Sequence, residues 1–145
     1  MNHWLNVHHP VPLGDKPEEY NKLYVQEVGR RRIDQIFVDD VVFIYETAAK
    51  GGESVRIDND WVVLSKGDKG LVAATRVSSR FKPKRFIYDG KLFIGEYDTE
   101  PISHNFVPLE EIQRRWPNKF TPHMNGGLRE LTPYEASILR GLMGF

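Results

Sequence analysis

Asp40-Val41-Val42-Phe43-Ile44-Tyr45 is the stretch that decides the fold. Its apolar residues are β-branched or aromatic, and the run from Val38 to Tyr45 is too short for a typical buried helix. The pattern therefore predicts a strand in the centre of a sheet. Asp39 and Asp40 stand directly before its apolar residues Val41 to Tyr45, where aspartate usually forms a turn. Paired carboxylates also suit acid–base catalysis, but turn chemistry is favoured at this position.

Three more strand segments follow the predicted turn at Thr47–Gly52. They are Ser54 to Leu64, interrupted at Asp58-Asn59-Asp60; Gly70 to Val77; and Phe86 to Ile94, interrupted at Asp89-Gly90. Asp-Gly accepts the positive φ angles of a type I′ turn, so the last segment is predicted to be a hairpin. The middle of the chain is therefore expected to be an antiparallel meander.

The segments before the meander are predicted to be one strand and one helix. His3 to Val7 alternates and is expected to be a short strand. Tyr20, Leu23, Tyr24 and Val28 recur at helical spacing, which predicts a helix over Pro17–Arg30.

Two helices are predicted near the end of the chain. Leu109, Ile112 and Trp116 favour a short helix after Pro108 that Pro117 closes. Thr132-Pro133-Tyr134-Glu135 has the pattern of a capping box, and it begins a helix that ends before Gly144. A strand is possible at Leu128 to Leu131. The order of elements indicates one α+β domain over residues 1–145, with a curled β-barrel of mixed or antiparallel strands and flanking helices.

The composition limits the classes of function. The 145 residues include no cysteine, which excludes disulfides and thiolate chemistry, and no apolar run is long enough to span a membrane. The first ten residues do not have the pattern of a secretory signal, so a cytoplasmic location is expected. Twenty basic and twenty acidic residues give no net charge, which argues against nonspecific coating of nucleic acid.

Basic residues are nevertheless concentrated locally. Between Arg76 and Lys91 six basic residues accompany one acidic residue, and Arg30-Arg31-Arg32 forms a second cluster. These segments are either ordinary solvated surface or a face that contacts phosphates. The candidate phosphate-binding residues are Arg76, Arg80, Lys82, Lys84 and Arg85.

Catalytic and metal motifs are absent from the sequence. It contains no nucleophile elbow, phosphate-binding loop, dinucleotide fingerprint or HExxH motif. His8 and His9 are adjacent on predicted extended chain and point to opposite faces, while His3, His104 and His123 have no ligand spacing. We expect no metal, no cofactor and no catalytic residue.

Several aromatic residues lie on or beside the predicted strand ends. They are Trp4, Tyr45, Trp61, Phe93, Tyr97, Phe106 and Trp116. Each is most simply a core residue, because aromatic side chains dominate protein cores. As a set they could also enclose a base, which needs stacking surfaces and a few polar groups at its edge.

Five segments, in order along the chain, resemble the EVE family, a PUA-like family related to the YTH and ASCH modules. They are Trp4-Leu5 followed by Pro10, Asp40 to Tyr45, Lys69 to Ala74, Val107-Pro108-Leu109 and Gly127-Leu128-Arg129. Two positions depart from the family pattern. Val7-His8-His9-Pro10 replaces Lys-Ser-Glu-Pro, and Asp39 replaces the glycine before the aspartate.

The resemblance implies a PUA-like fold with a pocket at the barrel mouth for a modified base flipped from DNA or RNA. Trp4 and Tyr45 would wall or support the pocket, and Asn6 and His8 would offer donors and acceptors to the base. The other candidates for base binding are Trp61, Phe106 and Arg129. The alternative role for Trp4 is a core residue under the final helix. The implied partners are nucleic acid carrying a modified base and an effector protein, such as a restriction or RNA-modification component.

Two other functions stay open at this point. One is a module that binds a small molecule or a protein at the barrel mouth. The other is a hydrolase or ribonuclease, because the related ASCH modules are thought to include such enzymes.

Overall fold

The computed structural model describes residues 1–8, 22–47, 54–64, 66–122 and 127–145. Its sheet is organised around β3 (Val41–Glu46), in which every residue is buried. β1 (His3–His8) pairs with β3 in parallel, and β6 (Gly70–Val77) pairs with its other side antiparallel. The prediction of a central strand is therefore confirmed.

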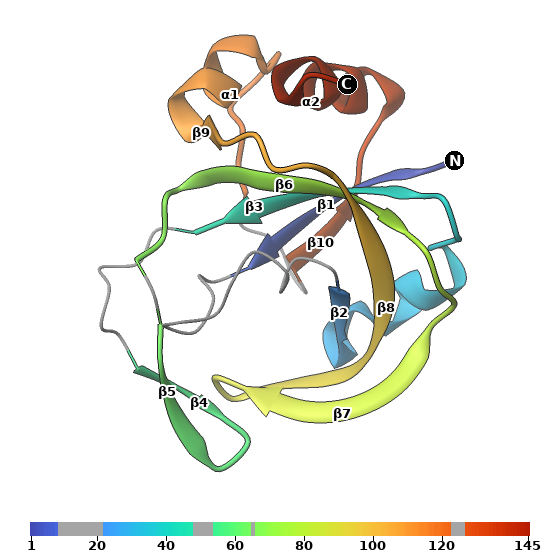
Figure 1. Ribbon diagram of the computed structural model, residues 1–145, viewed down its shortest axis with the longest axis vertical. Helices are drawn as coiled ribbons and strands as arrows, with labels where there is room; N and C mark the ends of the chain where they lie inside the picture. Colours follow the sequence, from blue (N-terminus) through green and yellow to red (C-terminus); the bar gives the residue numbers. More distant parts are fainter. Residues whose placement is uncertain (9–21, 48–53, 65, 123–126) are drawn as a thin grey trace.

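The sheet continues on both sides of this centre in the order β10-β1-β3-β6-β8-β7-β4-β5, while β2 pairs with β8 and β9 pairs with β6. The remaining strands are β2 (Lys22–Gln26), β4 (Ser54–Ile57), β5 (Asp60–Val63), β7 (Lys82–Tyr88), β8 (Lys91–Ser103), β9 (Val107–Pro108) and β10 (Leu128–Glu130). The long β8 curves and pairs with β6, β7 and β2, which curls the mixed sheet into a half-barrel (Figure 1). The strand at β10 and the barrel architecture agree with prediction.

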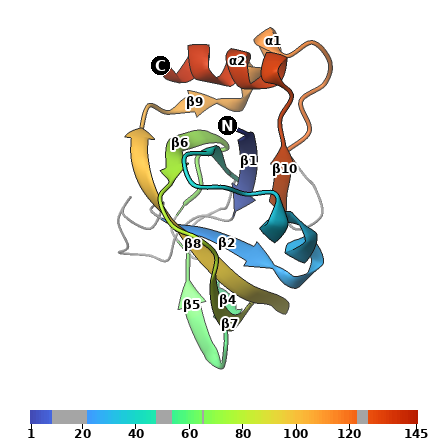
Figure 2. The ribbon, with the colours of Figure 1, turned by 90° about the vertical axis from the view of Figure 1, so that its right-hand side faces the viewer.

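Two α-helices lie together across one face of the sheet, as Figures 1 and 2 show. α1 (Leu109–Arg115) follows Pro108 and ends before Trp116. α2 (Pro133–Met143) begins with the predicted capping box, in which Thr132 and Glu135 bond each other's backbone N–H groups. It ends at Gly144, whose φ of 86° closes the helix in the left-handed region. Both C-terminal helices are confirmed.

The sheet separates two hydrophobic clusters. The cluster under the helices includes Leu5, Phe43, Tyr45, Leu71, Ile112, Phe120, Leu139 and Met143. The cluster inside the half-barrel includes Trp4, Leu23, Val25, Val42, Ile44, Ala73, Val77 and Tyr97. Because side chains alternate along β1 and β3, each of these strands supplies residues to both clusters.

The predicted hairpin at Asp89-Gly90 is present, and the segment interrupted at Asp58-Asn59-Asp60 forms a second hairpin. The predicted meander is wrong, because β6 lies between β3 and β8 and β4 pairs with β7. β4 and β5 are joined at Asp58-Asn59, and Asp58 has a φ of 52°. β7 and β8 are joined at Asp89-Gly90, with φ angles of 49° and 78°. Positive φ at both residues is the property for which Asp-Gly was recognised in the sequence.

The predicted helix over Pro17–Arg30 is wrong where the structure describes it. Residues 22–26 form β2, and the 3-10 helix η2 (Glu27–Asp34) follows. Leu23 and Val25 point into the half-barrel, which is strand alternation, and Val28 is 69% exposed. Residues 17–21 and most of the predicted turn at 47–52 lie outside the described residues.

Candidate functional site

One end of the half-barrel, here called the mouth end, is defined by the ends of β1, β3 and β9 and the start of β6. His8 pairs with Glu46, Glu46 pairs with Gly70, and Gly70 pairs with Pro108. These positions lie on the left in Figure 1, whereas η2 and the connection from β6 to β7 lie on the right. Asn6 and His8, two of the residues that the resemblance assigns to a base-binding pocket, belong to the half of β1 at this end.

Polar side chains tie the strands together at the mouth end. The Asn6 side-chain amide donates to the Gly127 carbonyl oxygen at 3.0 Å, which joins β1 to the segment before β10. A Cβ at Gly127 would lie 2.7 Å from the Val7 carbonyl oxygen, and its φ is 65°, so this close approach requires glycine. The Thr47 backbone N–H donates to the His8 carbonyl oxygen at 3.0 Å. Asn6 and His8 are both half-buried there.

Glu46 adds a buried carboxylate at this end, a feature that sequence analysis missed. Only 5% of the residue is exposed, and its Oε1 accepts a hydrogen bond of 3.1 Å from the Asp68 backbone N–H. The carboxylate thus fixes the connection that leads from β5 into β6. This contact could not be predicted from the residues around Glu46, because Asp68 lies 22 residues away in the sequence.

Trp4 and Tyr45 do not meet. Trp4 is fully buried inside the half-barrel, and Tyr45 is buried under the helices, where its ring lies 5.8 Å from that of Phe120. Burial, and then the charge of Glu110, raise the pKa of Tyr45. The sheet lies between the two rings, so they do not form opposite walls of one cavity.

Trp4 is instead bound to the turn before β3. Its indole Nε1–H donates to Asp40 Oδ2 at 3.1 Å, and the backbone N–H groups of Asn2 and Phe37 donate to the same carboxylate at 2.9 and 3.0 Å. Asp40 is 2% exposed. The tryptophan and the aspartate of the resemblance are therefore one hydrogen-bonded unit. Trp4 is a core residue, as its alternative role required, but it does not pack under the final helix, because its side chain lies on the other face of the sheet.

The remaining candidates for base binding are dispersed. Phe106 is 49% exposed and lies beside Gly70 at the mouth end. Trp61 is 69% exposed on β5. Arg129 bonds Glu135 at 3.1 Å, and its guanidinium lies 6.0 Å from the centre of the Trp116 ring. Arg129 thus has a structural role between β10 and α2.

The predicted phosphate-binding residues divide into two groups. Lys82 and Lys84 form ion pairs with Asp98 and Glu96 on the neighbouring strand. Hydrogen bonds from Lys82 and then from Lys22 lower the pKa of Asp98, which shows how strongly this carboxylate is engaged. These two lysines are therefore partly neutralised within the sheet.

Arg76, Arg80 and Arg85 are exposed and form no ion pair within the part of the chain that the structure describes. Arg76 lies near the end of β6 and pairs with Val41 at the beginning of β3. Gly70 is the first residue of β6 and lies at the mouth end. Six residues of strand separate them, which is about 20 Å. The structure does not bring Arg76 together with Asn6 and His8.

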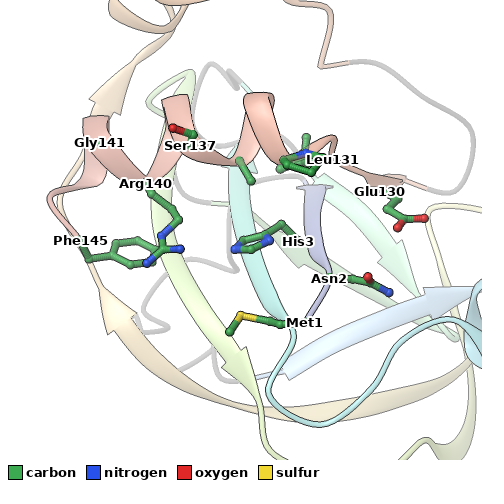
Figure 3. Close-up of a pocket in the computed structure, with 11 residues that line it drawn as sticks. Met1, Asn2, His3, Glu130, Leu131, Ser137, Arg140, Gly141 and Phe145 are labelled. Atoms are coloured by element: carbon green, nitrogen blue, oxygen red, sulfur yellow. The ribbon is translucent and has the colours of Figure 1, made fainter.

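A groove of about 570 Å³ lies beside α2, at the beginning of β1 and away from the mouth end (Figure 3). Figure 3 shows Arg140, His3 and Phe145 around it, and the Arg140 guanidinium lies 5.4 Å from the centre of the Phe145 ring. Burial, and then the charge of Arg140, lower the pKa of His3. This hollow was not anticipated from the sequence.

The described residues contain no group of three or more histidine, aspartate or glutamate side chains placed to hold a metal ion. His9 and His123 lie outside the described residues. No helix within the described ranges is long and apolar enough to cross a membrane.

Comparison with known proteins gives matches among solved structures. No known protein family matches the sequence, and no curated protein does. The chain is similar to human THYN1 in a crystal structure with DNA that contains 5-methylcytosine, with a TM-score of 0.55 and 12% identity over 100% of this chain and 99% of that one. It is also similar to protein PSPTO5229 from Pseudomonas syringae, with a TM-score of 0.50 and 10% identity over 97% and 99% of the two chains. The predicted curled barrel with flanking helices is therefore confirmed, and the chain shares the fold of these two proteins.

Proposed function

We propose that this protein binds nucleic acid and recognises a modified base at the mouth end of its half-barrel. The observation that carries the proposal is the likeness to human THYN1, whose crystal structure contains 5-methylcytosine DNA, because it extends over the whole of this chain. The fold alone does not fix a function, so the polar groups at the mouth end must supply the recognition.

Asn6 and His8 are the residues proposed to contact the base. The Asn6 NH₂ group donates to Gly127, which directs the amide and leaves its side-chain oxygen as an acceptor. Such an acceptor suits the exocyclic amine of cytosine or adenine. Tyr45, in the core under the helices, supports this end, and Phe106 offers an exposed ring beside it.

The test is a titration of labelled oligonucleotides that carry 5-methylcytosine, 5-hydroxymethylcytosine, N6-methyladenine or no modification, as DNA and as RNA. Fluorescence anisotropy at about 50 mM and about 200 mM salt separates base recognition from phosphate attraction, which salt weakens. We expect one modification to bind more tightly than the unmodified oligonucleotide at both salt concentrations. Equal affinity for every base would contradict base recognition, and cleavage of the oligonucleotide would indicate a hydrolase.

Asn6→Ala and Asn2→Ala form a matched pair for this test. Each removes an amide that donates to a backbone carbonyl, but Asn2 lies at the other end of β1 and donates to Gln35. We expect Asn6→Ala to reduce the preference for the modified base about 5- to 150-fold, which corresponds to about 1–3 kcal/mol for one base contact. Asn2→Ala should keep the preference, and thermal unfolding of both variants checks that they are folded.

A further inference from the structure

The hairpin of β4 and β5, here called the β4–β5 arm, carries a tryptophan in contact with water. Figures 1 and 2 both show the arm extending from the half-barrel on the side away from α1 and α2. Trp61 on β5 is 69% exposed, whereas Trp4 is fully buried. Val63, on the same face of β5, is also exposed. Large apolar side chains gathered on one exposed face indicate an interaction surface.

The turn end of the arm is held firmly against β7. Ile57 pairs with Tyr88 of β7, and the backbone N–H of Asp58 donates to the Ile87 carbonyl oxygen at 2.7 Å. The Ile87 N–H in turn donates to Asp58 Oδ1 at 2.9 Å. β5 is the last strand in the sheet order of the described residues, so Trp61 stands on an anchored arm at the edge of that sheet.

Arg56 and Trp61 form one flat surface on the arm. They are directly opposite each other in the register of β4 and β5, and the Arg56 guanidinium lies 5.9 Å from the centre of the indole ring. Aromatic rings and guanidinium planes are the two side-chain surfaces on which unpaired nucleobases stack. The contact between them also limits the rotation of both side chains, which reduces the entropy lost on binding.

The arm is connected directly to the mouth end. After β5 the chain passes through exposed Lys66 and Lys69 and enters β6 at Gly70. Acidic residues accompany these cations, because Asp60 lies next to Trp61 and Asp68 lies between the two lysines. The net charge of this segment therefore does not indicate a surface for nucleic acid. The feature that does is the planar pair of Arg56 and Trp61 on the arm.

We propose that the β4–β5 arm is a stacking platform for an unpaired base that flanks the base held at the mouth end. This inference rests on the proposed function and adds a second contact outside the pocket. Trp61 thereby increases the affinity for the nucleic-acid strand, and it does not determine which modified base is preferred. Stacking on an aromatic side chain contributes about 1–3 kcal/mol per base and tolerates any sequence.

The experiment compares four proteins: wild type, Trp61→Ala, Trp61→Phe and Phe37→Ala. Phe37 is the matched control, because it is 60% exposed and follows η2 at the other end of the half-barrel. Each protein is titrated with single-stranded oligonucleotides with and without 5-methylcytosine at about 50 mM and about 200 mM salt. Trp61→Ala should weaken binding about 5- to 150-fold at both salt concentrations, and Trp61→Phe should recover most of the loss. Phe37→Ala should bind like wild type.

The outcomes separate this inference from the proposed function. If Trp61→Ala binds like wild type while wild type still prefers a modified base, the arm has no role and the proposed function stands. If Trp61→Ala removes the preference itself, Trp61 belongs to the pocket and the inference is overturned. Loss of self-association in light scattering, with nucleic-acid binding unchanged, would make the arm a protein interface instead. If wild type binds every oligonucleotide equally but Trp61→Ala weakens them all, the platform stands and base recognition fails.

Discussion

Asp39 shows how one backbone angle accounts for a departure from a family pattern. The residue has a φ of 77°, a region that glycine enters freely and that side chains generally avoid. Its backbone N–H donates to the Val77 carbonyl oxygen at 2.8 Å, which fixes the turn before β3. The glycine that the EVE pattern has at this position suits the same conformation, and aspartate is among the few other residues that tolerate it.

Asp39→Gly is therefore expected to leave the free energy of unfolding unchanged or to raise it by up to about 1.5 kcal/mol. Relief of backbone strain is about 1–2 kcal/mol, and the greater freedom of glycine in the unfolded chain offsets about 0.4–1 kcal/mol of it. Asp39→Val should lower stability by about 1–3 kcal/mol, because a β-branched residue is strained at this angle. Urea denaturation measures both. A glycine variant less stable than the valine variant would contradict this account of the turn.

The contacts of Asp40 show what a sequence does not reveal at this scale. The turn at Asp39-Asp40 was predicted from residue type, and the structure contains it. The bond from Trp4 to Asp40 spans 36 residues. It depends on β1 lying parallel beside β3, and the alternation of strand residues does not specify which strands are neighbours. For the same reason Trp4 and Tyr45 were predicted to act together, although the sheet separates them.

Elements with strong local signals were predicted well. The Asp-Gly hairpin, the capping box and the proline before α1 act within a few residues of the chain, and all three elements are present. The prediction of a helix at 22–30 failed because Leu23, Tyr24 and Val28 fit a helical period, while Leu23 and Val25 fit the alternation of a strand. Pairing of β2 with β8 decided between the two, and that pairing is a long-range contact.

The capping box of α2 provides a prediction at the scale of an element. The Thr132 hydroxyl accepts from the Glu135 backbone N–H at 3.2 Å, and the Glu135 carboxylate accepts from the Thr132 N–H at 2.9 Å. Thr132→Ala should lower the free energy of unfolding by about 1 kcal/mol, whereas Thr132→Ser keeps the hydroxyl and should change it little. Thermal or urea unfolding measures the difference. Equal stability of the two variants would show that the cap does not hold α2 on the core.

At the scale of the whole molecule, the question is which end of the half-barrel contacts the phosphates of a bound strand. The groups proposed to contact the base lie at the mouth end, and so do exposed Lys66 and Lys69. The exposed arginines Arg76 and Arg80 belong to the other end, near the beginning of β3. A strand held at the mouth end would reach the lysines first, because about 20 Å of β6 separates the two sets. The sequence pointed to the arginines because they belong to its most basic segment, and linear charge density does not report which end of a barrel a residue occupies.

Two double variants decide between these cations. Lys66→Gln with Lys69→Gln should weaken oligonucleotide binding and reduce the slope of log K against log salt by about 1–2, since each phosphate contact contributes about 0.7–0.9 to that slope. Arg76→Gln with Arg80→Gln removes the same amount of charge from the other end and should leave the slope unchanged. Both sets are exposed, so neither double variant is expected to unfold the protein. If the arginine variant alone reduces the slope, the phosphates follow the end of β6 near Arg76, and the strand enters from the side of η2.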